Sequence, residues 1–231
     1  YCDVLSKFCL FDGKARSAFR MSLVIAIDGP AASGKGTLAR RLAAHYGLEH
    51  LDTGLLYRAT AAGVLARGGN LDNEAEAAAI AQTLDCATLD RETLSHHEIS
   101  EAASKVAAFP GVRRALFDLQ RQFATREGGA VLDGRDITTV ICPDATVKLF
   151  VTASPEVRAR RRFDEAQAKG NNASYAVILD DIQRRDARDS MRTEAPLTNT
   201  GSAHLIDTTQ MDIETAFRQA CAFVEQSRRT G

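Results

Sequence analysis

A glycine-rich stretch near the start of the chain joins a short apolar run to a helical pattern. The apolar run Leu23 to Asp28 (LVIAID) predicts a buried strand, and the residues after it read GPAASGKGT. Such a loop exposes consecutive backbone N–H groups, and the N-terminus of the following helix adds partial positive charge, so the loop can bind phosphate groups. The candidate phosphate-binding residues are Gly29, Pro30, Ala31, Ala32, Ser33, Gly34, Lys35, Gly36 and Thr37.

Two residues of this loop have expected roles of their own. Lys35 is expected to reach the β- and γ-phosphates of a nucleotide as a point charge. The usual motif has Ser or Thr directly after the lysine, where the hydroxyl binds Mg²⁺. Here Gly36 intervenes, and Thr37 supplies the hydroxyl, so Thr37 is the candidate magnesium ligand.

Short apolar runs and helical patterns alternate along the rest of the chain. Further strands are predicted at Ala130 to Asp133, Val147 to Val151 and His204 to Asp207. Helices are predicted at residues 34–46, 54–67, 74–84, 100–108, 112–125, 155–169, 175–189 and 213–227. The alternation predicts an α/β fold in which helices flank a parallel β-sheet core.

Composition excludes several classes of protein. With 45% hydrophobic and 26% charged residues among 231, the chain is neither disordered nor fibrous. A formal charge of −1 argues against nucleic acid as a partner, and no apolar run approaches the roughly 20 residues that a membrane helix needs. Five scattered cysteines without CxxC spacing favour a reducing compartment, so a cytoplasmic location is expected. Residues 1–20 carry no periodic pattern and are expected to be a leader or a disordered extension before one folded domain at 21–231.

Arginine is distributed unevenly. Arg58, Arg113 and Arg135 follow predicted turns or lie in helices beside small residues. Eight more arginines lie between residues 157 and 192: Arg158, Arg160, Arg161, Arg162, Arg184, Arg185, Arg188 and Arg192. Transfer of a phosphoryl group to another phosphate gathers negative oxygens, and arginine can bind two of them at once. For a single arginine taken alone, a solvated helix face with ion pairs is the alternative interpretation.

The two arginine-rich helices are joined by Ala168 to Ser174 (AKGNNAS), which predicts the tip of a helical hairpin. A mobile hairpin of this kind could close over a triphosphate. The loop itself is compatible with a GTPase, an ATP-driven motor or a small-molecule kinase. The chain has no NKxD guanine motif and no HRD or DFG motif, which disfavours GTPases and protein kinases.

Five further motifs occur in a fixed order along the chain. They are LDTGLLYR (51–58), AASKVAAFPGVR (102–113), LDGRDITTVICPDA (132–145), TASPEVRARRR (152–162) and RRDARDSMRTEAPL (184–197). With the GKGT ending of the loop, these motifs resemble those of the bacterial cytidylate kinases, or (d)CMP kinases, in the nucleoside monophosphate kinase family. The resemblance implies a P-loop NTPase-type sheet with its core at 21–52, 109–156 and 193–231. It further implies a helical monophosphate-binding region at 53–108 and an arginine-rich helical lid at 157–192.

The resemblance implies an activity and the residues that carry it. The implied reaction is ATP-dependent phosphorylation of CMP and dCMP to CDP and dCDP, with ATP as the phosphoryl donor and Mg²⁺ as the cofactor. The residues implied to hold the phosphate of CMP or to line its pocket are Thr53, Arg58, Arg135, Arg185 and Arg192. The residues implied to read cytosine are Ser104, Arg113 and Asp136, and those implied to face the sugar hydroxyls are Arg185 and Asp189. The lid arginines implied to close on ATP are Arg158, Arg161 and Arg162. The implied catalytic set is Lys35, Arg135, Arg158, Arg162, Arg185 and Arg192.

The chemistry of the base agrees with this assignment. Cytosine carries an exocyclic amine and ring acceptors, which are complementary to the Asp136 carboxylate and to donors on Arg113 and Ser104. Uracil would place a carbonyl against the carboxylate. Asp133, at the end of a predicted strand, is expected either to cap a loop or helix or to lie near the magnesium ion or the substrate phosphate.

The chain departs from the family pattern in two places. Residues 86–99 are few for a region where longer members carry a β-rich insert, and Thr138 stands where many relatives have glycine. A local backbone difference without loss of chemistry is expected at Thr138.

Three other functions stay open: a UMP/CMP kinase of broad base tolerance, a shikimate-type kinase with Asp133 as base, and a nucleotide sensor without turnover. The expected partners are small molecules only, and a monomer is expected.

Overall fold

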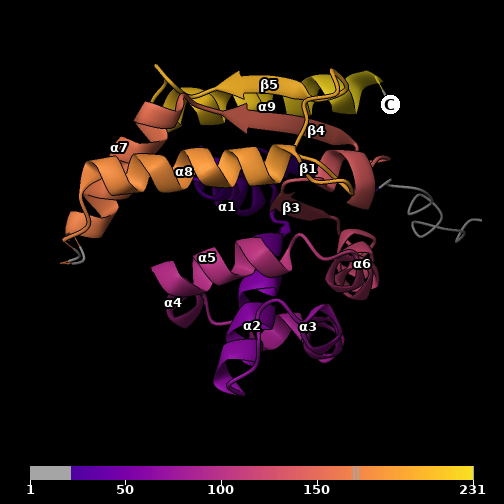
Figure 1. Ribbon diagram of the computed structural model, residues 1–231. Coiled ribbons are helices and arrows are strands. Elements are labelled where there is room, and N and C mark those ends of the chain that lie inside the picture. The colour runs from indigo at the N-terminus through magenta and orange to yellow at the C-terminus, as the bar shows by residue number, and fades with distance from the viewer. Residues whose placement is uncertain (1–21, 169, 171, 231) are drawn as a thin grey trace, which may run out of the picture.

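Within residues 22–168, 170 and 172–230, which the computed structural model describes, five parallel strands form one sheet (Figure 1). The strands are β1 (Val24–Asp28), β2 (Glu49–Asp52), β3 (Ala130–Gly134), β4 (Val147–Thr152) and β5 (His204–Asp207). Their order in the sheet is β2-β3-β1-β4-β5, so the strand before the glycine-rich loop is central. The predicted α/β fold with a parallel sheet is confirmed, while the extension expected at residues 1–20 lies outside the described residues.

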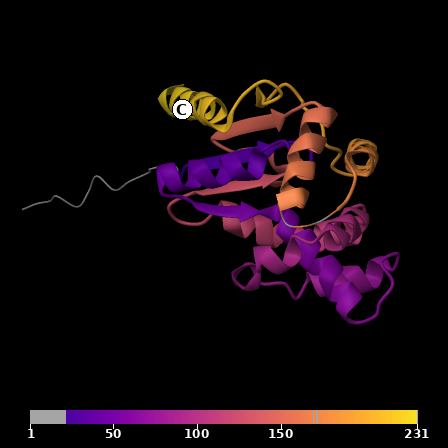
Figure 2. The same ribbon diagram turned by 90° about the vertical axis from the view of Figure 1, so that its left-hand side faces the viewer.

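Helices cover both faces of the sheet (Figures 1 and 2). They are α1 (Lys35–Tyr46), α2 (Thr53–Ala66), α3 (Glu74–Ala81), α4 (Arg91–Leu94), α5 (His97–Val106), α6 (Pro110–Ala124), α7 (Pro155–Ala168), α8 (Tyr175–Ser190) and α9 (Ile213–Thr230). Two short non-α segments are η1 (Cys86–Thr88), a 3-10 helix, and η2 (Ile137–Ile141), a π-helix. Among the described helices, none combines the length and the apolar character needed to cross a membrane.

The alternation of side chains along β1 divides the hydrophobic core into two clusters. Ile25 and Ile27 point to one face, where they pack with residues of α1 and α9. Ala26 points to the other face, where α2, α3, α5 and α6 form a larger cluster. Both clusters contain residues that are completely buried, so the central strand is covered on its two faces as expected for a parallel sheet.

The helices α7 and α8 pack against each other as the predicted hairpin, with Ala159, Ile178 and Ile182 as a small core of their own. Ser174 caps α8, because its hydroxyl accepts a hydrogen bond from the N–H of Val177 at 3.4 Å. In Figure 1, α8 crosses in front of the sheet and lies above α5. The arginine-rich hairpin is therefore next to the helices between β2 and β3.

The strand β2 and the helix α4 were not predicted. In β2 (EHLD) only Leu51 is buried, so the sequence contains no apolar run that would indicate a strand. The strand forms through its parallel pairing with β3 at the edge of the sheet. The helix α4 lies in the short segment 86–99 and begins at Asp90, whose carboxylate accepts hydrogen bonds from the N–H groups of Glu92 and Thr93.

A buried carboxylate joins the central strand to η2. Asp28, at the end of β1, accepts hydrogen bonds from the N–H of Ile137 (2.8 Å), the N–H of Thr138 (2.8 Å) and the Thr138 hydroxyl (2.7 Å). Asp28 and Thr138 are both buried. Thr138, one of the departures from the family pattern, thus contributes a hydroxyl donor that glycine lacks. The segment that follows β3 is fixed to β1 by these three bonds.

Replacing Asp28 with asparagine is expected to lower the free energy of unfolding by about 2 kcal/mol, since an amide N–H₂ would then face a buried donor. Urea denaturation measures the change. Thr138→Val is the matched control, because it removes one hydroxyl donor and leaves both backbone bonds in place, and its effect should be less than half as large. An Asp28→Asn protein as stable as the parent would show that the carboxylate does not hold η2.

Candidate functional site

The glycine-rich loop wraps the carboxyl end of β1 and ends at the N-terminus of α1. At Gly29, a Cβ atom would lie 2.0 Å from the carbonyl oxygen of Val151, so the backbone has no room for a side chain there. Gly34 precedes α1 with φ +89°, a conformation that favours glycine. These two constraints give the loop its shape, and they place Lys35 as the first residue of α1.

The Lys35 side chain is half-buried at the start of α1. Its Nζ lies 3.5 Å from the carbonyl oxygen of Pro30. Burial, together with the positive charge of Arg135, lowers the pKa of Lys35 to about 7. A bound anion would stabilise the charged form of Lys35 and offset the cost of its burial.

A cavity of about 570 Å³ opens beside the loop and extends toward α2, α5 and α8. It lies at the carboxyl ends of the strands, where ligands bind in open parallel sheets. The predicted site residues that line it are Ala31, Ala32, Ser33, Gly34, Lys35, Gly36, Thr37, Thr53, Arg58, Ser104, Arg113, Asp133, Arg135, Asp136, Arg161, Arg162, Arg185, Asp189 and Arg192. Gly29, Pro30 and Arg158 belong to the predicted set but do not line the cavity.

Three arginines in the cavity carry unused donors. The Nε atoms of Arg58, Arg185 and Arg192 are buried, and no partner accepts from them within the part of the chain that the structure describes. Burial lowers the pKa of Arg58 and of Arg192, and burial together with the charge of Arg135 lowers the pKa of Arg185 to about 9. Buried donors without partners are costly, and an anion with several oxygens would satisfy them.

Asp189 holds Arg192 and a further arginine, Arg135, in position. Its carboxylate accepts a hydrogen bond from Nε of Arg135 at 2.8 Å and forms a short ion pair with Arg192. Burial alone would raise the pKa of Asp189, but the surrounding arginines hold it below the ordinary value. Burial likewise opposes the charge of Arg135, and the ion pair with Asp189 nevertheless raises the pKa of Arg135.

A second group of polar residues occupies the end of the cavity formed by α5 and α6. Arg113 on α6 forms a buried ion pair with Asp136, and its Nη1 donates to the carbonyl oxygen of Ala107 at 3.2 Å. The guanidinium carbon of Arg113 lies 5.7 Å from the centre of the Tyr57 ring. Ser104 on α5 lines the same cavity. A carboxylate, a guanidinium and a hydroxyl are thus brought together as predicted.

Asp133 is the last residue but one of β3 and lies beside the phosphate loop. Its Oδ1 lies 2.7 Å from Nε2 of His50, and its carbonyl oxygen accepts from the Thr53 hydroxyl at 2.9 Å. Burial would raise the pKa of Asp133, but the hydrogen bond from His50 and the charge of Lys35 lower it. An ionised carboxylate therefore lies close to the Lys35 ammonium.

Thr37 lies in the first turn of α1 and lines the cavity. Its hydroxyl accepts a hydrogen bond from Nη2 of Arg40 at 3.2 Å. Across residues 22–168, 170 and 172–230, no cluster of three or more His, Cys, Asp or Glu could enclose a metal ion. The donor set fits Mg²⁺, which commonly keeps several waters and binds substrate phosphates together with few protein ligands.

The three predicted lid arginines lie in different places. Arg161 donates to the hydroxyl and the carbonyl oxygen of Thr208 at 3.0 and 2.7 Å, and Arg162 has no carboxylate partner among the described residues. Arg158 is buried behind the loop, where it forms a two-point ion pair with Asp186 and donates to the carbonyl oxygen of Ala31. The structure therefore brings Arg161 and Arg162 to the cavity and leaves Arg158 as a support of the loop.

Several residues of the cavity were missed by the sequence interpretation. Asp52 ends β2, and its Oδ2 accepts from Nη2 of Arg91 on α4 at 2.7 Å; both residues line the cavity. Tyr57 also lines it. Asp52 and Tyr57 could have been found, because both belong to the motif LDTGLLYR that indicated Thr53 and Arg58. Arg91 had no such signal, since it lies outside the recognised motifs.

A phosphate loop after the central strand of a parallel sheet, facing a second cluster of cations across one cavity, defines a P-loop kinase. The sequence model of cytidylate kinase matches residues 25–226. The chain belongs to the cytidylate kinase family.

Individual relatives agree with the family match. The chain is 62% identical over 206 residues to a cytidylate kinase of Azorhizobium caulinodans, covering 89% of this chain and 100% of the relative. It is 58% identical over 204 residues to a cytidylate kinase of Brucella suis biovar 1, covering 88% and 93%. A solved structure from Eubacterium ventriosum shares the fold with a TM-score of 0.53 at 16% identity, covering 88% of this chain and 99% of that one.

Proposed function

We propose that this protein transfers the γ-phosphoryl group of ATP to the phosphate of CMP or dCMP, giving ADP with CDP or dCDP. The observation that carries the proposal is the group of buried, unpartnered guanidinium donors on Arg58, Arg185 and Arg192, which shares one cavity with the phosphate loop. The loop supplies a site for the phosphates of the donor, and the arginines supply a site for the phosphate of the acceptor.

The acceptor needs no general base. The second pKa of a phosphate monoester is about 6, so its nonbridging oxygens are largely charged at neutral pH and can attack the γ-phosphorus in line. The oxygen–phosphorus bond to the acceptor forms as the bond to the β-phosphate oxygen of ATP breaks. Catalysis then depends on position and on charge neutralisation by Lys35, Arg135, Arg162, Arg185 and Arg192, which are the proposed catalytic residues that line the cavity.

Mg²⁺ bound by Thr37, phosphate oxygens and water would neutralise further charge on the transferring group. Arg161 and Arg162 are proposed to approach the ATP phosphates when α7 and α8 close, while Arg158 supports the loop from behind. Asp189 is proposed to face the sugar while it orients Arg135.

The cysteine usage supports a cytoplasmic location. A monomer is the proposed oligomeric state, and sedimentation velocity tests it.

Selection of cytosine is assigned to Asp136, Arg113 and Ser104. The Asp136 carboxylate accepts only, so it is complementary to the exocyclic amine of cytosine and repels the carbonyl that uracil has in its place. Arg113 holds this carboxylate in place through their buried ion pair. A broad UMP/CMP kinase would not need a buried carboxylate at this position.

A coupled assay of ADP release with ATP and Mg²⁺ tests the proposal, using CMP, dCMP, UMP, AMP and shikimate as acceptors. Turnover with CMP and dCMP, and little with the others, is the expected result. Equal turnover with CMP and UMP would support the kinase activity but contradict the role of Asp136 in selecting cytosine. Turnover with shikimate alone would assign a hydroxyl acceptor, with Asp133 as its base, and no turnover with any acceptor would leave a nucleotide sensor.

The pKa of Lys35 predicts how ATP affinity depends on pH. With a pKa of about 7, Lys35 is mostly charged at pH 6 and mostly neutral at pH 8.5. ATP phosphates favour the charged form, so binding at pH 8.5 should take up nearly one proton, and the Kd for ATP should rise up to about tenfold per pH unit above pH 7.

Calorimetry in buffers of different ionisation enthalpy measures this proton uptake. Lys35→Met is the control, because its remaining proton exchange belongs to ATP itself and to other groups. Equal proton uptake by the parent protein and by Lys35→Met at pH 8.5 would contradict the prediction.

A further inference from the structure

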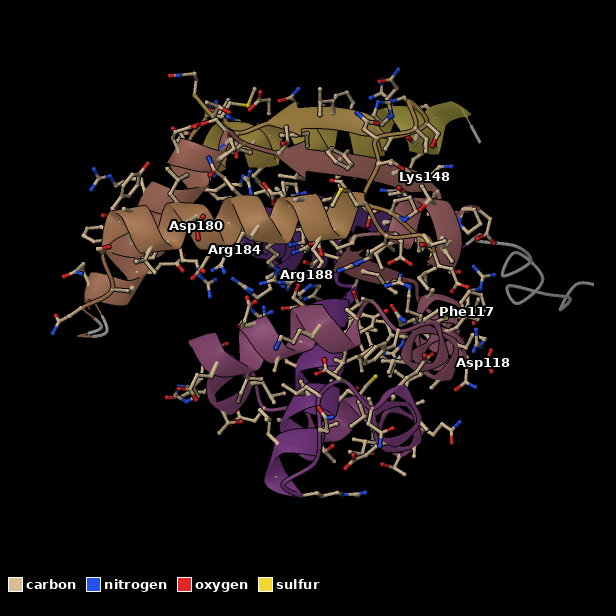
Figure 3. The ribbon with its side chains drawn as sticks, viewed as in Figure 1. Phe117, Asp118, Lys148, Asp180, Arg184 and Arg188 are labelled. Carbon is tan, nitrogen blue, oxygen red and sulfur yellow. The ribbon has the colours of Figure 1, made fainter. Side chains whose placement is uncertain are left out.

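A contact between α8 and α5 lies just outside the cavity. Arg188 on α8 donates from Nη1 to the Ser104 hydroxyl oxygen at 2.7 Å and from Nη2 to Oε1 of Glu101 at 3.2 Å. Figure 3 shows Arg188 on the side of α8 that faces α5. Arg188 does not line the cavity, whereas Ser104 does and is 2% exposed. Among the described residues, Ser104 is the cavity-lining side chain to which Arg188 donates a hydrogen bond.

The chemistry of the two groups fixes the direction of this hydrogen bond. A guanidinium has donors only, and a hydroxyl has one hydrogen and two lone pairs. Ser104 must accept from Arg188, so its own hydrogen stays available. Among the described residues, no acceptor receives that hydrogen. With one lone pair taken by Arg188, the Ser104 hydroxyl keeps its hydrogen and one lone pair, and the hydrogen is available to a ligand in the cavity.

We propose that Arg188 is a specificity-determining positioning residue, which makes Ser104 a hydrogen-bond donor toward the pyrimidine ring. The inference rests on the proposed function and deepens it. A donor on Ser104 and an acceptor on Asp136 together match a base with a ring acceptor and an exocyclic amine, which is cytosine. Uracil has N–H at ring position 3 and a carbonyl in place of the amine. Without Arg188, the Ser104 hydroxyl can rotate and accept from that N–H.

Glu101 supports the same arrangement. Its carboxylate pairs with Nη2 of Arg188 from the same helix that carries Ser104, one turn earlier. The guanidinium is thereby held between two acceptors on one face of α5. Because Arg188 belongs to the arginine-rich hairpin, selection of the base depends on where α8 lies relative to α5.

The test compares CMP with UMP as acceptors in steady-state kinetics. Arg188→Ala is expected to lower the ratio of kcat/KM for CMP to that for UMP by about tenfold, the value of one hydrogen bond. The change should occur in KM for CMP, with kcat altered less than about twofold. Arg188→Lys keeps a group that only donates and should restore most of the ratio.

Two further variants separate positioning from support of the fold. Arg184 lies one turn earlier on α8, is exposed, and pairs with Asp180 and Asp181, so Arg184→Ala removes the same charge and should leave the ratio unchanged. In the double variant Arg188→Ala with Ser104→Ala, the ratio should equal that of Ser104→Ala alone, because Arg188 acts through Ser104. Additive effects, or an equal loss with both acceptors, would overturn the proposal.

Calorimetry without ATP gives the Kd values for CMP and UMP. Their ratio is a second measure of base selection, and it does not depend on turnover. If the parent protein binds CMP more tightly than UMP but phosphorylates neither, the proposed function fails, and the binding ratio of Arg188→Ala still tests Arg188. A parent protein that does not distinguish the two nucleotides would overturn the role given to Ser104. Should Arg188→Ala fail to fold, Arg188→Gln replaces it, since an amide can donate or accept and should also lower the ratio.

Discussion

The variant Arg135→Ala is expected to lower kcat/KM for CMP by about 10³-fold, within the range that cations give to phosphoryl transfer. Arg135 lines the cavity between the phosphate loop and the arginines of α8, and its Nε is held by Asp189. Alanine removes the cation and leaves the buried Asp189 carboxylate with Arg192 as its remaining close ion pair. Steady-state ADP release with CMP measures the loss.

Arg135→Lys and Arg184→Ala are the controls for this prediction. Lysine keeps the charge but cannot reproduce the planar guanidinium that binds both Asp189 and a phosphate, so about a tenth of the activity or less should remain. Arg184→Ala removes an exposed charge from the arginine-rich hairpin, outside the cavity lining, and should retain full activity. An Arg135→Ala enzyme with more than a tenth of the parent activity, and with an unchanged circular dichroism spectrum, would contradict the role of Arg135.

Replacing Lys35 with methionine should lower kcat by about 10³-fold, because it removes the cation that the phosphate loop itself contributes to neutralising the transferring phosphoryl group. The same variant should be more resistant to heat at pH 6. The pKa of Lys35 is lowered from its ordinary value to about 7, so folding disfavours its charged form. That destabilisation is fully present below pH 7 and disappears as the pH rises toward 10.5, the ordinary pKa of lysine.

Melting temperatures at pH 6 and pH 10 test the predicted gain in thermal stability of Lys35→Met. The difference between Lys35→Met and the parent protein should be largest at pH 6 and should shrink at pH 10. Lys148→Met serves as the comparison, since the Lys148 ammonium lies at an exposed hydrogen bond to the carbonyl oxygen of Pro143, away from the cavity. A less stable Lys35→Met protein at pH 6 would show that the buried ammonium stabilises the fold.

The sequence predicted the parts of the site that depend on local pattern. The loop from Gly29 to Thr37 was identified because its glycines, its lysine and the flanking strand and helix are close in sequence. The residues Ser104, Arg113 and Asp136 were found through motifs, and the structure places all three in the lining of one cavity. Motifs thus identified site residues that are far apart in the sequence, but only residues that belong to a recognised motif.

The parts that were missed depend on tertiary structure. The strand β2 has one buried residue and forms only because β3 lies beside it, so a pattern of hydrophobicity could not indicate it. Arg158 belongs to a motif with Arg161 and Arg162. On α7, however, the Arg158 side chain lies behind the loop, where it is buried and forms an ion pair with Asp186. Residue type and spacing alone do not determine whether an arginine on an amphipathic helix faces a ligand or a buried carboxylate.

The hydrogen bonds that Asp28 accepts from Ile137 and Thr138 have a consequence for the geometry of the proposed reaction. The strand β1 continues directly into the loop that is proposed to hold the donor, and its last residue holds the segment just after Arg135 and Asp136, which are proposed to hold the acceptor. The proposed binding sites of the two reacting phosphates are therefore both fixed to the central strand of the sheet. Movements of the outer helices can admit nucleotides and exclude water without disturbing the alignment of the attacking oxygen with the γ-phosphorus.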